Sequence, residues 1–107
     1  MIIYSVTISL DAGIEGGWVE WMRQTHIPEV LRTGCFSECR IHKAVATESP
    51  EPVYVMQYSC PSLDEYHRYR DNFAAALQKD HTDRFSGRFR GSRQVLEEIA
   101  VLSASVS

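Results

Sequence analysis

The chain has 107 residues, of which 44% are hydrophobic and 23% are charged. This profile is typical of one soluble globular domain, and the length is too short for two domains. The 11 basic and 14 acidic residues give a formal net charge of -3. Because binding to nucleic-acid phosphates requires a basic excess, a nucleic-acid partner is not expected.

The N-terminal segment alternates apolar side chains with small polar ones. The apolar series is Ile2, Tyr4, Val6, Ile8 and Leu10. A period of two is typical of a strand with one apolar face. No basic leader precedes these residues, and Ser and Thr interrupt them, so neither a signal peptide nor a membrane partner is expected. The expected location is the cytoplasm.

The next segment is predicted to be helical up to Gly34, which can end a helix. Its apolar residues recur three and four positions apart, as on one helix face: Ile14, Trp18, Trp21 and Met22. Pro28 lacks a backbone donor and crowds the turn before it. We therefore expect an interruption at this proline and a bend at His26.

Residues 35–45 and 53–60 are predicted to form two strands of a hairpin, because a breaker-rich polar stretch separates them. These segments hold the three cysteines, Cys35, Cys39 and Cys60, with no Cys-x-x-Cys pair. If Cys35 and Cys39 share one strand, they lie beyond disulfide reach. Free thiols are expected, in agreement with a cytoplasmic location.

A second helix is predicted to begin after Ser62. Ser62 and Glu65 match a capping box, and the apolar helical period continues beyond them. We expect a kink at Asn72 and the end of the helix before Gly87. Residues 88–99 then have the pattern of a long final strand.

The expected element order is strand, helix, strand, strand, helix, strand. This order predicts a single α+β domain over residues 1–107 with the ferredoxin-like βαββαβ fold. In this fold a four-stranded antiparallel sheet carries both helices on one face. Residues 101–107 are expected to form a frayed tail.

The sheet face without helices is predicted to be partly apolar. The residues expected there are Ile3, Phe36, and either Val53 with Val55 or Tyr54 with Met56. A lone protomer would expose these side chains to water, so the chain is expected to form a homodimer.

Two histidines and one arginine are the candidate catalytic residues. His26 lies at the predicted proline bend, and His81 has Arg84 three residues further along the same helix. An imidazole in a pocket can act as an acid or a base near neutral pH, and Arg84 can hold an anionic group. The structural alternatives are a bend-stabilising hydrogen bond for His26 and a helix-capping role for His81.

A second set of residues is predicted to bind a ligand. The aromatic candidates are Trp18, Trp21, Tyr58, Tyr66 and Phe85. Such rings favour a flat apolar ligand, although they can equally form the core. Arg93, on the final strand, is a candidate anchor for an anion if it points inward, and otherwise a solvated or dimer-rim arginine.

No cofactor and no metal are expected. None of the four histidines has the spacing His-x-x-x-His or His-Glu-x-x-His, and no cysteine pair adds ligands. Haem binding through His81 remains a minor alternative.

Four segments carry a resemblance that spans about residues 1–99. They are Trp18–Met22, Thr25–Leu31, Gly34–Phe36 and His81–Phe85. Together they resemble a family of small uncharacterised bacterial proteins in the dimeric α/β-barrel superfamily, which is distantly similar to antibiotic-biosynthesis monooxygenases. The resemblance implies a ferredoxin-like protomer, a second copy packed against its sheet, and a pocket between sheet and helices. No catalytic signature of the better described relatives matches this sequence residue by residue.

The leading functional hypothesis is a homodimer with a pocket for a small aromatic or polyketide-like molecule. In this hypothesis a histidine removes a proton from an acidic C–H group or a phenol, and Arg84 or Arg93 stabilises the anion. A deprotonated substrate of this kind can activate oxygen without a cofactor, as in the monooxygenase relatives. The alternative is a ligand-binding or regulatory module that catalyses no reaction.

Overall fold

The computed structural model describes residues 1–105. Its strands are β1 (Ile2–Leu10), β2 (Glu38–Lys43), β3 (Val53–Cys60) and β4 (Phe89–Glu97). Its helical segments are η1 (Ala12–Ile14), α1 (Glu15–Trp21), η2 (Met22–His26), α2 (Ile27–Arg32), α3 (Leu63–Asn72) and α4 (Ala74–Phe85). Residues 106 and 107, the end of the predicted frayed tail, lie outside the described residues.

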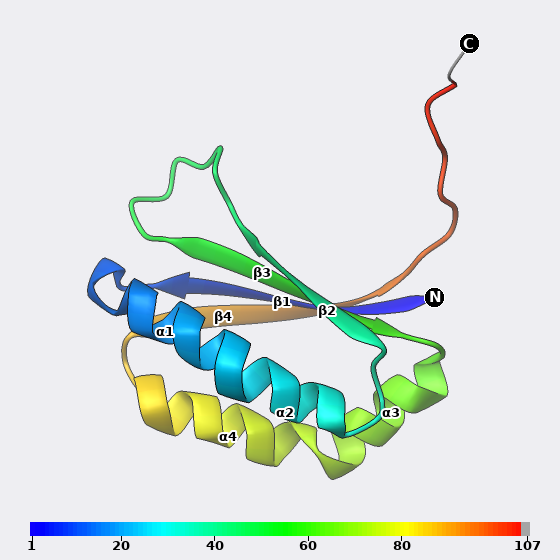
Figure 1. Ribbon diagram of the computed structural model, residues 1–107, viewed down its shortest axis with the longest axis horizontal. Coiled ribbons are helices and arrows are strands. Elements are labelled where there is room, and N and C mark those ends of the chain that lie inside the picture. Colours follow the sequence, from blue (N-terminus) through cyan, green and yellow to red (C-terminus); the bar gives the residue numbers. More distant parts are fainter. Residues whose placement is uncertain (106–107) are drawn as a thin grey trace.

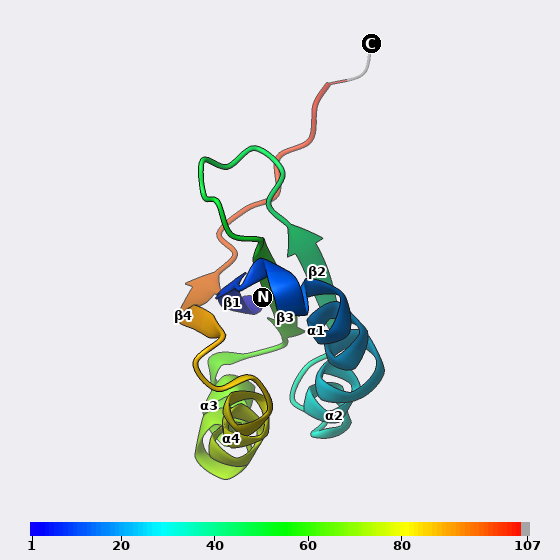
Figure 2. The ribbon, with the colours of Figure 1, turned by 90° about the vertical axis from the view of Figure 1, so that its left-hand side faces the viewer.

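The four strands form one antiparallel sheet in the order β2-β3-β1-β4. All long helices lie on one face of this sheet, as two adjacent rods (Figures 1 and 2). This arrangement confirms the predicted ferredoxin-like fold. The register sets Tyr4 opposite Tyr58 and Val6 opposite Arg93, so these side chains share the sheet face that the helices cover.

The first helical region stays continuous past Pro28, where an interruption was expected. Met22–His26 is a π-helical segment, and the N–H of Ile27 bonds to the carbonyl of Met22, five residues earlier. The wider turn lets Pro28 begin α2 in a position that requires no backbone donor. Figure 1 shows α1 and α2 as one run of helix. The extra residue of the π turn rotates His26 relative to a regular helix.

The second helical region begins and breaks where the sequence predicts. The Oγ of Ser62 accepts a hydrogen bond of 3.2 Å from the N–H of Glu65, which satisfies one free donor of the first turn. The helix breaks at Phe73, whose φ of -128° leaves the helical region. The break separates α3 from α4 and gives α4 its own orientation under the sheet.

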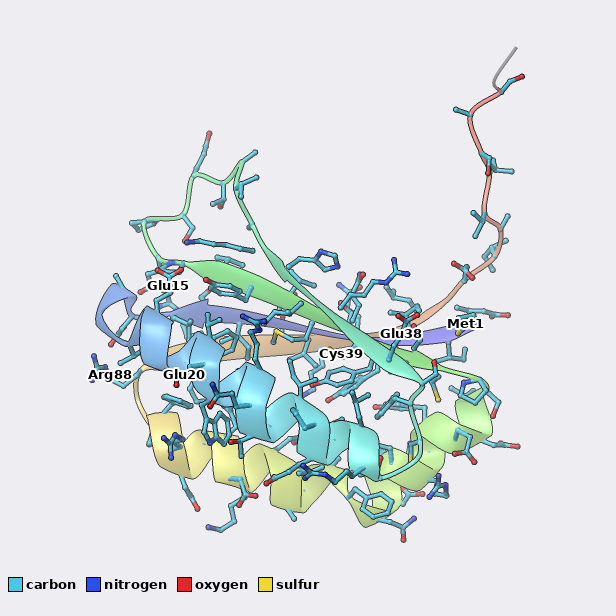
Figure 3. All side chains as sticks on the ribbon, in the orientation of Figure 1. Met1, Glu15, Glu20, Glu38, Cys39 and Arg88 are labelled. Carbon is cyan, nitrogen blue, oxygen red and sulfur yellow. The ribbon has the colours of Figure 1, made fainter. Side chains whose placement is uncertain are left out.

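The core lies between the sheet and the helices, and Figure 3 shows side chains filling this layer. Phe36, expected on the uncovered sheet face, is buried in the core instead. It precedes β2, which begins at Glu38, and its ring contacts those of Tyr4, Tyr58 and Tyr69 at 4.8 to 5.9 Å. Cys35 likewise lies before β2, not in one strand with Cys39, as a strand over 35–45 would require.

Of the two residue pairs considered for the uncovered sheet face, the structure places Val53 with Val55 there and Tyr54 with Met56 in the core. Tyr54, Met56, Tyr58 and Cys60 are buried beneath the helices. Val53 and Val55 therefore lie on the opposite face, where β1 contributes Ile3 and β4 contributes Leu96. Beyond β4, residues 98–105 extend away from the domain (Figure 1). Among the described residues, no helix has the length and apolar character needed to cross a bilayer.

Candidate functional site

One cavity lies in the core layer, and it is here called the central cavity. Its volume is about 40 Å³, which is room for about three water molecules. Polar lining comes from Tyr4, His26, Tyr58, Tyr69, Gln78, His81 and Arg93, and apolar lining from Val6, Ile8, Met22, Val30 and Met56. Two imidazoles, three phenols, an amide and a guanidinium in one small cavity are far more polar groups than a core of this size needs.

The two histidines meet at the central cavity although 55 residues separate them in the sequence. His26 comes from the π-helical segment η2 and His81 from α4, and their ring centroids are 5.8 Å apart. His26 stacks on Trp21 with a centroid distance of 5.0 Å. Its Nδ1 atom is buried and has no hydrogen-bond partner among the described residues. A buried nitrogen without a partner is costly in a purely structural role.

Both imidazoles are neutral at pH 7. Burial lowers the pKa of His26 to about 4, although the negative charge of Asp80 opposes this effect. Burial also lowers the pKa of His81 to about 4, and the charges of His26 and Arg93 act in the same direction. A neutral imidazole has one nitrogen that can accept a proton and one that donates a hydrogen bond. The pair can therefore supply both functions to a ligand.

Among residues 1–105, Trp18 is the side chain that forms a direct hydrogen bond to the histidine pair. Its Nε1 atom donates to Nε2 of His81 over 2.9 Å, inside the core. Trp18 is completely buried, and its ring also packs on Tyr54 with a centroid distance of 5.1 Å. The indole thus fixes the orientation of the His81 ring.

Arg93 faces three tyrosines across the central cavity. Burial raises the pKa of Tyr4, and the nearby Arg93 opposes this rise. Burial also raises the pKa values of Tyr58 and Tyr69. All three phenols are therefore protonated at neutral pH, and each can donate a hydrogen bond. Arg93 itself is exposed on the edge strand β4, which places its positive charge at the rim of the cavity.

The structure separates the predicted site residues into two groups. His26, Tyr58, His81 and Arg93 line the central cavity, whereas Arg84 lies outside it. The Arg84 guanidinium stacks on Trp21 at 5.4 Å, over an open surface depression that includes Trp21 but neither histidine. Arg84 follows His81 by one turn of α4, and its guanidinium is directed over Trp21, so it does not line the cavity.

The remaining aromatic candidates form walls behind the histidines. Trp18 bonds to His81, and Trp21 and Phe85 contact each other with ring centroids 5.3 Å apart. Phe85 also packs on His81 at 5.4 Å. Tyr66, by contrast, contacts Tyr4 at 5.5 Å and is absent from the cavity lining.

Sequence reasoning missed three polar residues of the central cavity, namely Tyr4, Tyr69 and Gln78. Tyr4 is the one polar member of the apolar face of β1, which is a detectable signal. Gln78 precedes His81 by three residues and so lies on an adjacent part of the helix surface. Tyr69 had no signal that distinguishes it from a core residue. Among residues 1–105, no group of three or more His, Cys, Asp or Glu side chains is placed to hold a metal ion.

Residues 1–99 match the model of a protein family described as a domain of unknown function, DUF4286. No curated protein matches the chain at a significant level.

Solved structures with the same fold cover nearly the whole chain. A dimeric ferredoxin-like protein from an uncultured marine organism has a TM-score of 0.69 at 11% identity, over 97% of this chain and 100% of its own. SnoaB, a cofactor-independent oxygenase from Streptomyces nogalater, has a TM-score of 0.69 at 11% identity, over 96% and 98%. An EthD family protein from Bacillus halodurans has a TM-score of 0.67 at 14% identity, over 92% and 100%. At these identities the likeness concerns the fold.

Proposed function

This chain belongs to the DUF4286 family, and we propose that it is a homodimeric protein whose central cavity removes a proton from a small planar ligand. The observation that carries this proposal is the meeting of His26, His81 and Arg93 around one partly open cavity. The ligand class is an enolisable carbonyl compound or a phenol, because a neutral imidazole can deprotonate such groups and an adjacent cation favours the resulting anion.

His26 is the proposed base. Its Nδ1 atom is buried and without a partner, and its pKa of about 4 keeps it neutral at pH 7. The proton moves from the C–H or O–H group of the ligand to Nδ1, and the electron pair stays on the ligand as an enolate or phenolate. Arg93, at the cavity rim, offsets the new negative charge.

The size of the central cavity restricts the ligand. A volume of about 40 Å³ is well below the range of about 300 to 1,000 Å³ that is usual for drug-sized ligands. Met22 and Met56 line the cavity, and their flexible side chains can move to enlarge it. A ligand no larger than about three water molecules fits without movement, whereas a diketone, and still more an aromatic or polyketide-like ligand, requires these side chains to give way.

The fold shared with SnoaB supports a further step within this proposal. SnoaB is described as a cofactor-independent oxygenase, and an enolate or phenolate can react with dioxygen without a metal or flavin. Proton removal by His26 would be the entry to this monooxygenase-like chemistry.

The proposal is tested with acetylacetone, a small planar diketone whose methylene protons exchange with deuterium oxide. We expect the protein to accelerate this exchange above the buffer rate, as followed by proton nuclear magnetic resonance (NMR). Arg93→Gln is expected to slow the catalysed exchange about tenfold, the value of one exposed charge-assisted hydrogen bond. Arg84→Gln is the matched control and should leave the rate unchanged, since Arg84 lies outside the cavity.

Two outcomes would contradict the proposal. If Arg84→Gln slows the exchange and Arg93→Gln does not, the reaction takes place in the surface depression beside Trp21. If acetylacetone quenches tryptophan emission but no catalysed exchange occurs, the chain is the ligand-binding module of the alternative hypothesis.

The homodimer is proposed from the uncovered sheet face. Ile3, Val53, Val55 and Leu96 lie on this face, and a protein of the same fold is described as dimeric. Packing two such faces together would remove these side chains from water and close a barrel.

Light scattering is expected to give about twice the chain mass of 12.2 kDa. Val55→Lys places a charge near the middle of the uncovered face and should shift the protein to the monomer mass. Ala76→Lys adds the same charge to an exposed position of α4 and should leave the dimer intact. A wild-type monomer, or a dimer that survives Val55→Lys, would exclude this interface.

A further inference from the structure

We infer that Trp18 is a positioning residue that holds His81 as a neutral hydrogen-bond donor, so that the two histidines of the central cavity have different roles. His26 removes the proton, and His81 binds the ligand oxygen on which negative charge develops. The role of His81 in binding the ligand oxygen rests on the proposed function. The position of the proton on the His81 ring does not, because it follows from the contact with Trp18.

The state of His81 follows from its contact with Trp18. The indole Nε1–H can only donate a hydrogen bond, and it donates to Nε2 of His81 over 2.9 Å. Nε2 must therefore be the unprotonated nitrogen of the ring. A neutral imidazole then carries its single proton on Nδ1, so His81 presents an N–H donor on that side.

The surroundings of His81 disfavour both a proton on Nε2 and a positive charge on the ring. Moving a proton to Nε2 would set two N–H groups against each other inside the core, because Trp18 is completely buried and His81 is 7% exposed. A charged His81 ring would face His26 from η2 and Arg93 from β4. The ring is also held by an edge contact with Phe89, whose centroid is 4.4 Å away.

His26 differs from His81 because one of its ring nitrogens is free of any hydrogen bond, as a base requires. No described side chain or backbone group bonds to its Nδ1 atom, so a proton can be accepted there without breaking a protein hydrogen bond. The contact with Trp21 is a stacking contact, with ring planes 24° apart, and it orients the ring without occupying a nitrogen. The two imidazoles are therefore equal in burial but unequal in hydrogen bonding.

This division narrows the ligand to compounds with an acceptor oxygen next to the acidic group. As His26 takes the proton, the electron pair moves onto this oxygen, which receives the Nδ1–H bond of His81 and the charge of Arg93. A donor that is already oriented stabilises the developing charge without reorganising. Phenols and enolisable carbonyl compounds meet this requirement, whereas simple amines do not.

The state of His81 is tested by nitrogen-15 NMR of the imidazole rings at neutral pH, without any ligand. We expect the wild-type spectrum to show the Nδ1–H form of His81. Trp18→Phe keeps an aromatic ring but removes the donor, and should produce a mixture of both neutral forms. Trp21→Phe is the matched control: the Trp21 ring packs near His81 but makes no hydrogen bond to it, so His81 should keep its Nδ1–H form in this variant. An Nε2–H form in the wild type, or an unaltered spectrum in Trp18→Phe, would overturn the inference.

The role of His81 is tested with acetylacetone exchange. Trp18→Phe is expected to slow the catalysed exchange about tenfold, the value of one oriented hydrogen bond to a charged group. In a His81→Asn background the same Trp18 substitution should have no further effect, because the histidine it positions is absent. Equal additional losses in both backgrounds would show that Trp18 acts only through packing.

The two tests separate this inference from the proposed function. Absence of catalysed exchange in the wild type, together with the expected change in the Trp18→Phe spectrum, would refute the proton-transfer function and leave the Trp18 effect on His81 standing. Catalysed exchange without the spectral change would leave the function standing and refute the role of Trp18.

Discussion

Replacing His26 with Gln is expected to slow the exchange of acetylacetone protons by about 10²- to 10⁴-fold, the usual contribution of a positioned general base. Gln keeps a polar side chain in the pocket but has no basic nitrogen that can accept the proton of the ligand. The measurement is the exchange rate in deuterium oxide at several acetylacetone concentrations. His67→Gln, on α3 and outside the cavity lining, is the matched control and should retain the wild-type rate.

Binding and proton removal can be separated in the same variants. Quenching of tryptophan emission by acetylacetone should change only a few-fold in His26→Gln, because Arg93 and His81 still contact the ligand. If His26→Gln exchanges protons at the wild-type rate, His26 is not the base. If it loses binding in proportion to the rate, His26 recognises the ligand without accepting its proton.

The stability of the folded protein is expected to fall steeply between pH 6.5 and pH 4. Each of His26 and His81 has a pKa of about 4 in the fold against 6.5 for an unperturbed histidine. Between these values the unfolded chain binds protons that the folded chain does not, so the free energy of unfolding is highest above pH 6.5 and decreases as the pH falls. Each histidine contributes about 3 kcal/mol to the free energy of unfolding above pH 6.5. This is a large share of the roughly 5 to 15 kcal/mol by which a typical domain is stable.

Urea unfolding at pH 7.5, 5.5 and 4.5 measures this effect. The variant with both His26→Gln and His81→Gln should lose most of the pH dependence in this range, whereas His67→Gln, on α3, should retain it. Glu15, whose pKa is lowered by a hydrogen bond from Lys43, adds acid sensitivity only below pH 4.5, the ordinary carboxylate range. A wild-type stability that is constant from pH 7.5 to 4.5 would show that the two imidazoles gain protons in the folded state.

Much of the fold could be predicted because its signals are local. The alternation in β1 and the capping box at Ser62 depend on residues within one or two turns of each other, and both elements are present. The helix order then leaves few ways to cover one sheet face. The π turn before Pro28 could not be predicted, because a sequence shows that proline disrupts a regular helix but not how the backbone adapts.

The sequence predicts which residue types belong to the candidate site, but not which of them meet in the fold. His26 and His81 could be named because they are titratable groups beside apolar helix faces. Their convergence depends on the crossing of η2 and α4 beneath the sheet, which no local spacing encodes. The sequence favours Arg84 because it lies close to His81 along the chain, yet Arg93, from another element, is the arginine that lines the cavity.

The sequence by itself thus determined the strand and helix order, the sheet with one covered face, and the residue types able to move a proton. These features follow from periodicity, capping and composition, which act over short distances along the chain. The tertiary structure alone decided that Phe36 is in the core, that Arg84 is outside the cavity, and that Trp18 bonds to His81. These outcomes depend on contacts between residues far apart in sequence, whose geometry is set when the helices pack on the sheet.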